Sequence, residues 1–222
     1  PWGDLTGIRP TKIPMKLLEE GWKNTEIARY MRETYGVSNE KTALAITIAN
    51  REKALLQDLD YENGYSLYVG IPFCPSICLY CSFGSHPLER WTKRVDEYLD
   101  TLCKELTFIR EQMGARKLTT VYIGGGTPTT LEPEQLRRLL SHIQETFDFT
   151  WVKEYTVEAG RPDSITREKL QVMKEFPVTR ISVNPQTMNQ KTLDVIGRKH
   201  TVEDTVNIFH MARELEFDNI NM

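Results

Sequence analysis

Residues 68–84 read YVGIPFCPSICLYCSFG and hold three of the four cysteines of the chain, Cys74, Cys78 and Cys81. The apolar run SLYVGIP at 66–72 ends at Pro72 and predicts a β-strand. The cysteines follow this strand at the spacing C-x3-C-x2-C, which is too close to staple distant parts of a fold. A cluster of this kind in a chain of 222 residues indicates a metal site or redox chemistry.

Strand and helix patterns alternate from Tyr65 to the end of the chain. Further strands are predicted by TTVYIGGG at 119–126, KEYTVEAG at 153–160, VTRISVNP at 178–185 and DNINM at 218–222. Helices between them are predicted at 92–113, 132–147, 166–176 and 202–217. This order predicts an α/β fold whose parallel sheet has right-handed helical crossovers. The repeat could close as a barrel or lie open as a doubly wound sheet.

Residues 1–60 have the pattern of a separate helical segment. Helices are predicted by MKLLEEG at 15–21, NTEIARYMRETYG at 24–36 and SNEKTALAITIANREKALLQ at 38–57. These helices carry no catalytic signature, so we interpret them as a docking or substrate-capping module. The expected domains are therefore the helical segment 1–60 and the α/β domain 61–222.

The composition and the cysteine usage exclude some classes of protein and favour others. The net charge of −3 gives no basic footprint for nucleic acid, and no apolar run reaches the length of a membrane span. The cysteine usage favours a reducing cytoplasm. The chain begins at Pro1 and stops at Met222 inside a predicted strand, so we expect a piece of a longer protein. Its barrel would be truncated in or before the fifth strand, with one open edge.

Residues with unusual chemistry gather where the predicted strands end. The cysteines follow the first strand, GGGTPT at 124–129 follows the second, Glu158 closes the third, and NPQ at 184–186 closes the fourth. Ligands of parallel α/β folds bind at the carboxyl ends of the strands. The sequence therefore predicts one active site built from four loops.

The three neighbouring cysteines are consistent with two kinds of metal site, or with buried structural thiols that bind no metal. Structural zinc needs four ligands, and His86 could be the fourth. An iron–sulfur cubane held by three thiolates keeps one iron open for a substrate, and the apolar residues of the loop favour this interpretation by shielding a cluster from water. Cys103 lies in the middle of a predicted helix and is expected to be a buried core thiol. The other histidines, His142, His200 and His210, are expected at the surface.

These motifs carry a resemblance to a known family. The cysteine motif, with Tyr80 before its last cysteine and a β/α repeat around it, resembles the radical S-adenosylmethionine (SAM) enzymes. YVGIPFC, VYIGGGTPTTL, Glu158 and RISVNPQTMNQKTLDVIGRKH together resemble the oxygen-independent coproporphyrinogen III oxidases, also called coproporphyrinogen dehydrogenases. The opening PWGDLTGIRPTK is similar to the long Gram-positive branch of that family.

The resemblance implies a fold, cofactors and a reaction. The fold would be a partial (β/α) barrel of radical SAM type behind the N-terminal helices. Cys74, Cys78 and Cys81 would hold a [4Fe-4S] cluster that binds SAM at its open iron. An electron-donor protein would reduce the cluster, and a 5′-deoxyadenosyl radical would start the oxidative decarboxylation of coproporphyrinogen III to protoporphyrinogen IX in haem biosynthesis.

The resemblance also implies binding roles for eight further residues. SAM would contact Tyr68, the glycine turn at Gly125 and Gly126, and Glu158. A second SAM-sized ligand would lie against Gln186 and Arg198, with Tyr80, Gly126 and Thr127 nearby. Three alternatives stay open from the residues themselves: Tyr68 as a strand aromatic that faces a helix, Glu158 as a salt-bridge partner of Arg161 or Arg180, and Arg198 as a surface arginine.

The sequence departs from the family in two places. Decarboxylating members carry a further cysteine two positions after the last ligand, where this chain has Phe83. Relatives with phenylalanine there include haem-binding chaperones that keep the SAM site without oxidase activity. A haem chaperone is therefore the alternative function, with porphyrinogen or haem as the small-molecule partner. The second departure is AGRP at 159–162, which replaces the usual acidic or Asn-Pro turn.

Overall fold

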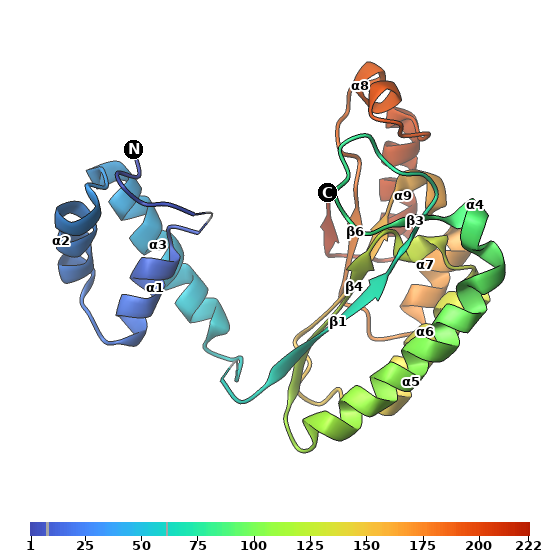
Figure 1. The fold of residues 1–222 in the computed structure, drawn as a ribbon, viewed down its shortest axis with the longest axis horizontal. Helices are drawn as coiled ribbons and strands as arrows, with labels where there is room; N and C mark the ends of the chain where they lie inside the picture. The colour runs from blue at the N-terminus through green and yellow to red at the C-terminus, as the bar shows by residue number, and fades with distance from the viewer. Residues whose placement is uncertain (8, 61) are drawn as a thin grey trace. The chain divides into compact units, whose positions relative to one another are not determined.

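The computed structural model describes residues 1–7, 9–60 and 62–222 (Figure 1). The chain forms two compact units, Pro1–Glu62 and Asn63–Met222. None of the described helices is long and apolar enough to cross a membrane.

The first unit contains the helices α1 (Lys12–Glu19), α2 (Asn24–Tyr35) and α3 (Asn39–Leu56). Helix α2 ends at Gly36, which adopts the left-handed conformation with φ 64°. Helix α3 begins after Ser38, whose hydroxyl accepts a hydrogen bond from the Lys41 N–H. One apolar face of each helix packs into a small core made of Leu17, Leu18, Ile27, Met31, Val37, Ala45, Ile46 and Ala49.

The second unit is built on a five-stranded parallel sheet. Its strands are β1 (Tyr65–Ile71), β4 (Leu118–Gly125), β5 (Glu154–Gly160), β6 (Arg180–Val183) and β7 (Ile220–Asn221). The strands pair in the order in which they occur along the chain. A doubly wound sheet reverses its strand order partway, whereas a β/α barrel does not. The predicted α/β fold with a parallel sheet is confirmed, and the strand order is that of a partial barrel.

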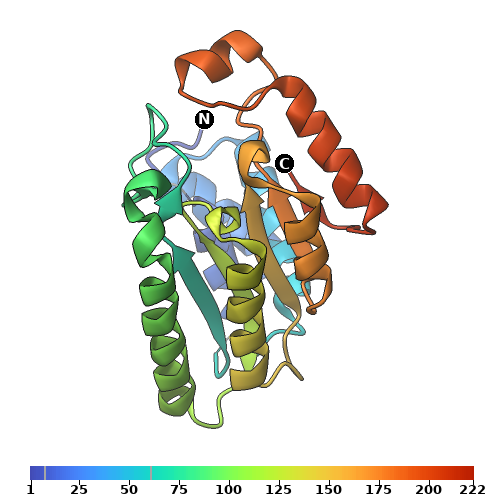
Figure 2. The ribbon, with the colours of Figure 1, turned by 90° about the vertical axis from the view of Figure 1, so that its right-hand side faces the viewer.

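Four helices connect the strands, as the sequence predicts: α5 (Val95–Met113), α6 (Pro133–Thr146), α7 (Arg167–Lys174) and α9 (Val202–Glu214). Figure 2 shows α5, α6 and α7 side by side against one face of the sheet. The sequence analysis missed several short elements, because periodicity cannot identify segments of two to six residues. They are β2 (Phe73–Cys74), β3 (His86–Pro87), α4 (Leu88–Trp91), α8 (Gln190–Val195) and the 3-10 turns η1 (Thr92–Arg94), η2 (Pro128–Thr130) and η3 (Pro162–Ser164).

The strands divide their side chains between two faces. The face against the helices is apolar and buried, and it includes Val69, Ile123, Val157 and Ile181. Because side chains alternate along a strand, the residues between them point to the opposite face. There Tyr68 is paired with Tyr122 across β1 and β4, and their rings are stacked 5.7 Å apart. Polar side chains therefore lie on this second face, which continues to the carboxyl ends of the strands.

Candidate functional site

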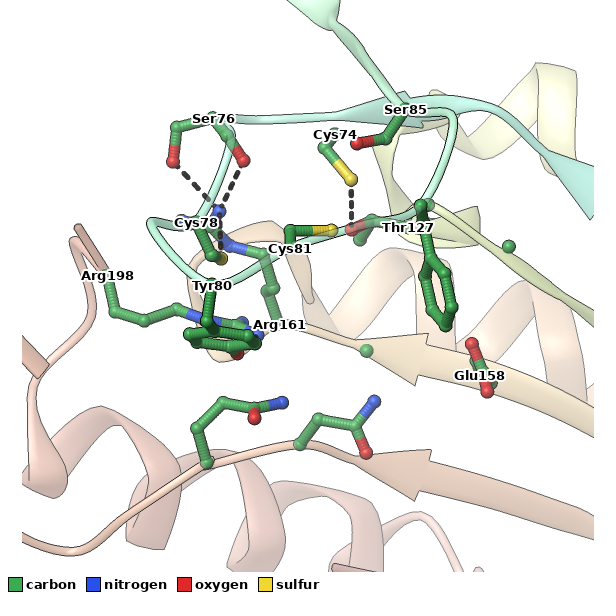
Figure 3. A pocket seen from close by; sticks show the side chains of 16 residues that line it. Cys74, Ser76, Cys78, Tyr80, Cys81, Ser85, Thr127, Glu158, Arg161 and Arg198 are labelled. Atoms are coloured by element: carbon green, nitrogen blue, oxygen red, sulfur yellow. Dashed lines mark hydrogen bonds between the residues drawn. The ribbon is translucent and has the colours of Figure 1, made fainter. Parts of the chain in front are cut away.

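One pocket lies at the carboxyl ends of β1, β4, β5 and β6 (Figure 3). Each of the four loops that follow these strands contributes to it. Its lining consists of Cys74, Ser76, Cys78, Tyr80, Cys81, Phe83, Ser85, Gly125, Gly126, Thr127, Glu158, Gly160, Arg161, Asn184, Gln186 and Arg198.

The cysteine loop brings three thiols into this pocket. Cys74 and Cys78 are buried and Cys81 is half-buried. The loop is closed locally by a hydrogen bond of 3.0 Å from the Cys81 N–H to the Cys78 carbonyl. The Leu79 N–H donates to the Ile196 carbonyl at 3.1 Å, so the loop is also tied to the segment after α8.

The glycine turn after β4 packs directly under the cysteine loop. The Gly126 N–H donates to the Ile71 carbonyl at 2.7 Å, and the Thr127 N–H donates to the Phe73 carbonyl at 2.8 Å. A Cβ at Gly126 would come within 2.6 Å of the Phe73 carbonyl and 3.0 Å of Cys74 Sγ. The turn therefore requires glycine at this position, and it places the Thr127 hydroxyl 3.5 Å from Cys74 Sγ.

Glu158 reaches the pocket from the end of β5. Its carboxylate accepts a hydrogen bond of 2.5 Å from the Tyr122 hydroxyl, and burial together with this carboxylate raises the pKa of Tyr122. The salt bridges considered for Glu158 are not the ones that form in the described part of the chain. Arg161 pairs with Asp163 instead, and Arg180 pairs with Glu154.

Arg198 lies beside Tyr80 at the other side of the pocket. Its Nη2 donates to the Tyr80 hydroxyl at 3.3 Å. The side chain is buried, and its Nε and Nη1 have no hydrogen-bond partner among the described residues. Gln186 stands nearby with φ 66°, a conformation that non-glycine residues rarely adopt and that is often kept at binding sites. Unpaired buried N–H donors of this kind favour an anionic ligand.

The donor set fits an iron–sulfur cluster better than a single ion. Among the described residues, no three His, Cys, Asp or Glu side chains are grouped closely enough to hold one metal ion. His86 instead lines a different cavity, where its ring packs 4.9 Å from Trp91. Three thiols that share a pocket without converging on one point suit a cluster, because each thiolate binds a different iron.

The pocket collects ten of the eleven predicted site residues. Tyr68 is the exception within the described chain; it is 63% exposed and stacks on Tyr122. The sequence analysis assigned no site role to Ser76, Ser85, Gly160 or Arg161, which also line the pocket. For Arg161 the signal was the unusual AGRP turn.

Two expectations about other residues were wrong. His200, expected at the surface, is 1% exposed, because its ring packs against the loop after β6, where its Nε2 lies 3.4 Å from the Pro185 carbonyl oxygen. Cys103, expected in the core, is only half-buried, since it lies outside the buried stripe of α5 that Leu99, Leu102 and Leu106 form.

Known proteins resemble this chain over most of its length. The family model of the radical SAM superfamily matches residues 68–222. The oxygen-independent coproporphyrinogen-III oxidase-like protein HemZ of Bacillus subtilis is 41% identical over all of this chain and 45% of its own length. The heme chaperone HemW of the same organism is 40% identical over 71% of this chain and 41% of its own length.

The solved structures give a similar result. The coproporphyrinogen III oxidase HemN from Escherichia coli matches with a TM-score of 0.65 and 29% identity, over 76% of this chain and 39% of that protein. The chain thus spans less than half the length of each of these three proteins.

Proposed function

The chain belongs to the radical SAM superfamily, and from that premise we propose that it is the catalytic part of an oxygen-independent coproporphyrinogen III oxidase. The reaction would convert two propionate groups of coproporphyrinogen III to vinyl groups, giving protoporphyrinogen IX. The observation that carries the proposal is the single pocket in which the cysteines, the glycine turn, Glu158 and Arg198 meet.

The cysteines would hold the cofactor that the superfamily implies. Cys74, Cys78 and Cys81 are free thiols in one pocket, as a [4Fe-4S] cluster with one open iron requires. When bound and reduced, this cluster supplies the electron that cleaves SAM to a 5′-deoxyadenosyl radical. A low-potential electron-donor protein is the expected partner, and free thiols fit a reducing cytoplasm.

The remaining pocket residues would bind and orient the ligands. Gly125 and Gly126 leave backbone groups open to close approach by the amino group of SAM. The Glu158 carboxylate, oriented by Tyr122, would accept hydrogen bonds from an amine or from ribose hydroxyls. The unpaired Nε and Nη1 of Arg198, with Gln186 beside them, would bind a carboxylate of a second SAM or of the substrate.

The proposed conversion balances as follows for each propionate. A hydrogen atom would pass from the carbon attached to the ring to the 5′-deoxyadenosyl radical that SAM supplies, which becomes 5′-deoxyadenosine. The substrate would then lose carbon dioxide. One further electron passes to a one-electron acceptor, which leaves the vinyl group. The pocket residues contribute by holding the propionate near SAM and by excluding water.

A haem chaperone is the second candidate, and Phe83 is the observation that favours it. Phe83 lines the pocket and is 73% exposed, at the position where decarboxylating members carry a cysteine. A large exposed aromatic at the mouth of a pocket suits a flat, apolar ligand such as haem. One of the relatives bears the name of a heme chaperone.

Anaerobic turnover tests the proposal. The full-length protein, reconstituted with iron and sulfide, is mixed with dithionite, SAM and coproporphyrinogen III. Mass spectrometry follows 5′-deoxyadenosine and the decarboxylated porphyrin. We expect both products from the wild type and neither from Cys78→Ala. If 5′-deoxyadenosine forms while the porphyrin stays intact, and haem titration gives a stable Soret band, the chaperone replaces the oxidase.

A further inference from the structure

An arginine that the proposed reaction does not use is buried against the cysteine loop. The strand pairing of β5 with β6 is irregular between Glu158 and Gly160, and Gly160 has φ 76°. Such irregularities redirect the side chains that follow them. Here the next residue is Arg161, whose side chain is only 4% exposed and lines the pocket.

The Arg161 guanidinium is held by both sides of its planar fork. Nε and Nη2 donate to the two carboxylate oxygens of Asp163, at 2.9 and 2.6 Å. The third nitrogen, Nη1, donates to the carbonyl and hydroxyl oxygens of Ser76, at 3.0 and 2.8 Å. The same Nη1 lies 4.0 Å from Cys78 Sγ. Figure 3 marks this contact with a dashed line. Asp163 thus fixes the orientation that turns one N–H edge toward a cysteine sulfur.

This cation keeps its charge despite its burial. Burial lowers the pKa of Arg161, but the hydrogen bonds and negative charge of Asp163 more than offset that effect, so the pKa is raised. Arg198, the other arginine of the pocket, donates to Tyr80. Of the two arginines that line the pocket, Arg161 is therefore the one that contacts a cysteine of the loop.

We infer that Arg161 sets the reduction potential of the cluster held by Cys74, Cys78 and Cys81, and that Asp163 is its positioning partner. Reduction adds one negative charge to a cluster. A fixed cation and an N–H near a ligating sulfur stabilise the reduced state, because hydrogen bonds and net charge set cluster potentials. Arg161 would make the cluster easier to reduce by a low-potential one-electron donor.

This inference rests on the cluster of the proposed function and is independent of which porphyrin is bound. Asp163 brings the opposite charge but lies on the far side of the guanidinium from Cys78, since the fork separates them. The two residues should therefore shift the potential in opposite directions when each is neutralised. A role limited to holding the loop in place would shift it in the same direction for both.

A redox titration of the reconstituted full-length protein tests this, monitored by electron paramagnetic resonance with dithionite as reductant and without SAM or porphyrin. We expect Arg161→Gln to lower the midpoint potential by an amount equal to a tenfold change in the equilibrium, about 59 mV for one electron. Asp163→Asn should raise it, because the asparagine Oδ1 can still accept a hydrogen bond from Arg161 while the negative charge is removed. Arg180→Gln is the matched control, because its ion pair with Glu154 lies at the opposite end of the sheet, and its potential should equal that of the wild type.

The possible results distinguish a failure of the role inferred for Arg161 from a failure of the cluster assignment. An unchanged potential in Arg161→Gln, or shifts of the same sign in Arg161→Gln and Asp163→Asn, would overturn the role of Arg161. If Arg161→Gln takes up too little iron to titrate, Asp163→Asn and Arg161→Lys decide, since the first should raise the potential and the second should keep it near that of the wild type. A wild type that binds no cluster would contradict the cluster assignment instead.

Discussion

The two ends of the parallel sheet carry the same kinds of charged side chains in opposite surroundings. At the amino end, Arg180 pairs with Glu154 at 3.5 Å, and their side chains are 31% and 42% exposed. At the carboxyl end, Arg161 pairs with Asp163 at 2.6 Å, and the exposed fractions are 4% and 17%. Glu154 and Arg180 are the first residues of β5 and β6, whereas Arg161 and Asp163 follow the end of β5.

The difference in burial changes what each pair can be expected to contribute. An exposed ion pair contributes about 0–1 kcal/mol to stability, and losing it changes little. A buried pair must offset the cost of removing two charges from water, so it is weak evidence for stability. The buried pair of Arg161 and Asp163 is therefore better explained by the role inferred for Arg161 than by a contribution to stability. Residues at the carboxyl end should therefore change cofactor chemistry, and matched residues elsewhere should not.

The largest expected effect comes from a ligand cysteine. Cys81→Ala should remove the cluster and lower turnover by about a thousandfold or more, because a cubane held by two thiolates is poorly retained. Cys103→Ala, a change on helix α5, should keep both the cluster and the turnover. Iron and sulfide content and the formation of 5′-deoxyadenosine are the measurements. A Cys81→Ala variant with full iron content would remove this residue from the ligand set.

The two glutamates of β5 give the next comparison, since they stand near opposite ends of one strand. Glu158→Ala should weaken SAM binding about 10- to 100-fold, the range of a lost hydrogen bond to a charged group. Glu154→Ala should leave SAM binding unchanged, because Glu154 interacts with Arg180 and Thr156 at the amino end. Calorimetric titration of SAM into the reconstituted protein measures both. Equal losses in the two variants would contradict the proposed contact.

A glycine of the turn after β4 and a glycine within β1 test the turn. An added methyl at Gly126 would overlap the backbone of the cysteine loop, so Gly126→Ala should cost about 1–3 kcal/mol of stability and reduce iron uptake. Gly70→Ala meets only the Tyr68 ring at 3.7 Å and should stay within about 0.5 kcal/mol of the wild type. Urea unfolding and iron content check both variants. A harmless Gly126→Ala would show that the loop can move away from the turn.

Long regular elements of this fold could be predicted from the sequence, because their patterns are local. The strand at β1 and the helix α5 follow from alternation and helical spacing alone. The convergence of the loops follows from a rule about parallel sheets. The contact of Arg161 with Cys78 could not be predicted, since 83 residues separate them. The AGRP turn marks the place as unusual, but it does not say that the irregular pairing at Gly160 brings Arg161 to Cys78.

His200 shows the same limit from the side of burial. Its segment GRKH is polar and suggests a surface turn, yet the fold encloses the ring completely. Burial depends on what packs over a residue, and the short helix α8 that leads into this turn was itself missed. Local composition therefore gave the wrong environment for a titratable group.

The smallest predicted effect is the pH dependence that His200 confers. Burial lowers its pKa below the usual 6.5, and Arg198 and Arg161 act in the same direction, while Asp163 and the Pro185 carbonyl oppose them. Below about pH 6.5 the unfolded chain binds the proton more readily than the folded chain does. The contribution of His200 to stability is therefore fully present above about pH 6.5 and is lost as the pH falls below it. Urea unfolding at pH about 7.5 and about 5.5 measures the effect. Between these pH values the free energy of unfolding should fall by more in the wild type than in His200→Gln.

His210→Gln, on the exposed side of α9, is the control and should behave as the wild type does. Equal losses in the wild type and His200→Gln would mean that the ring takes up its proton without unfolding.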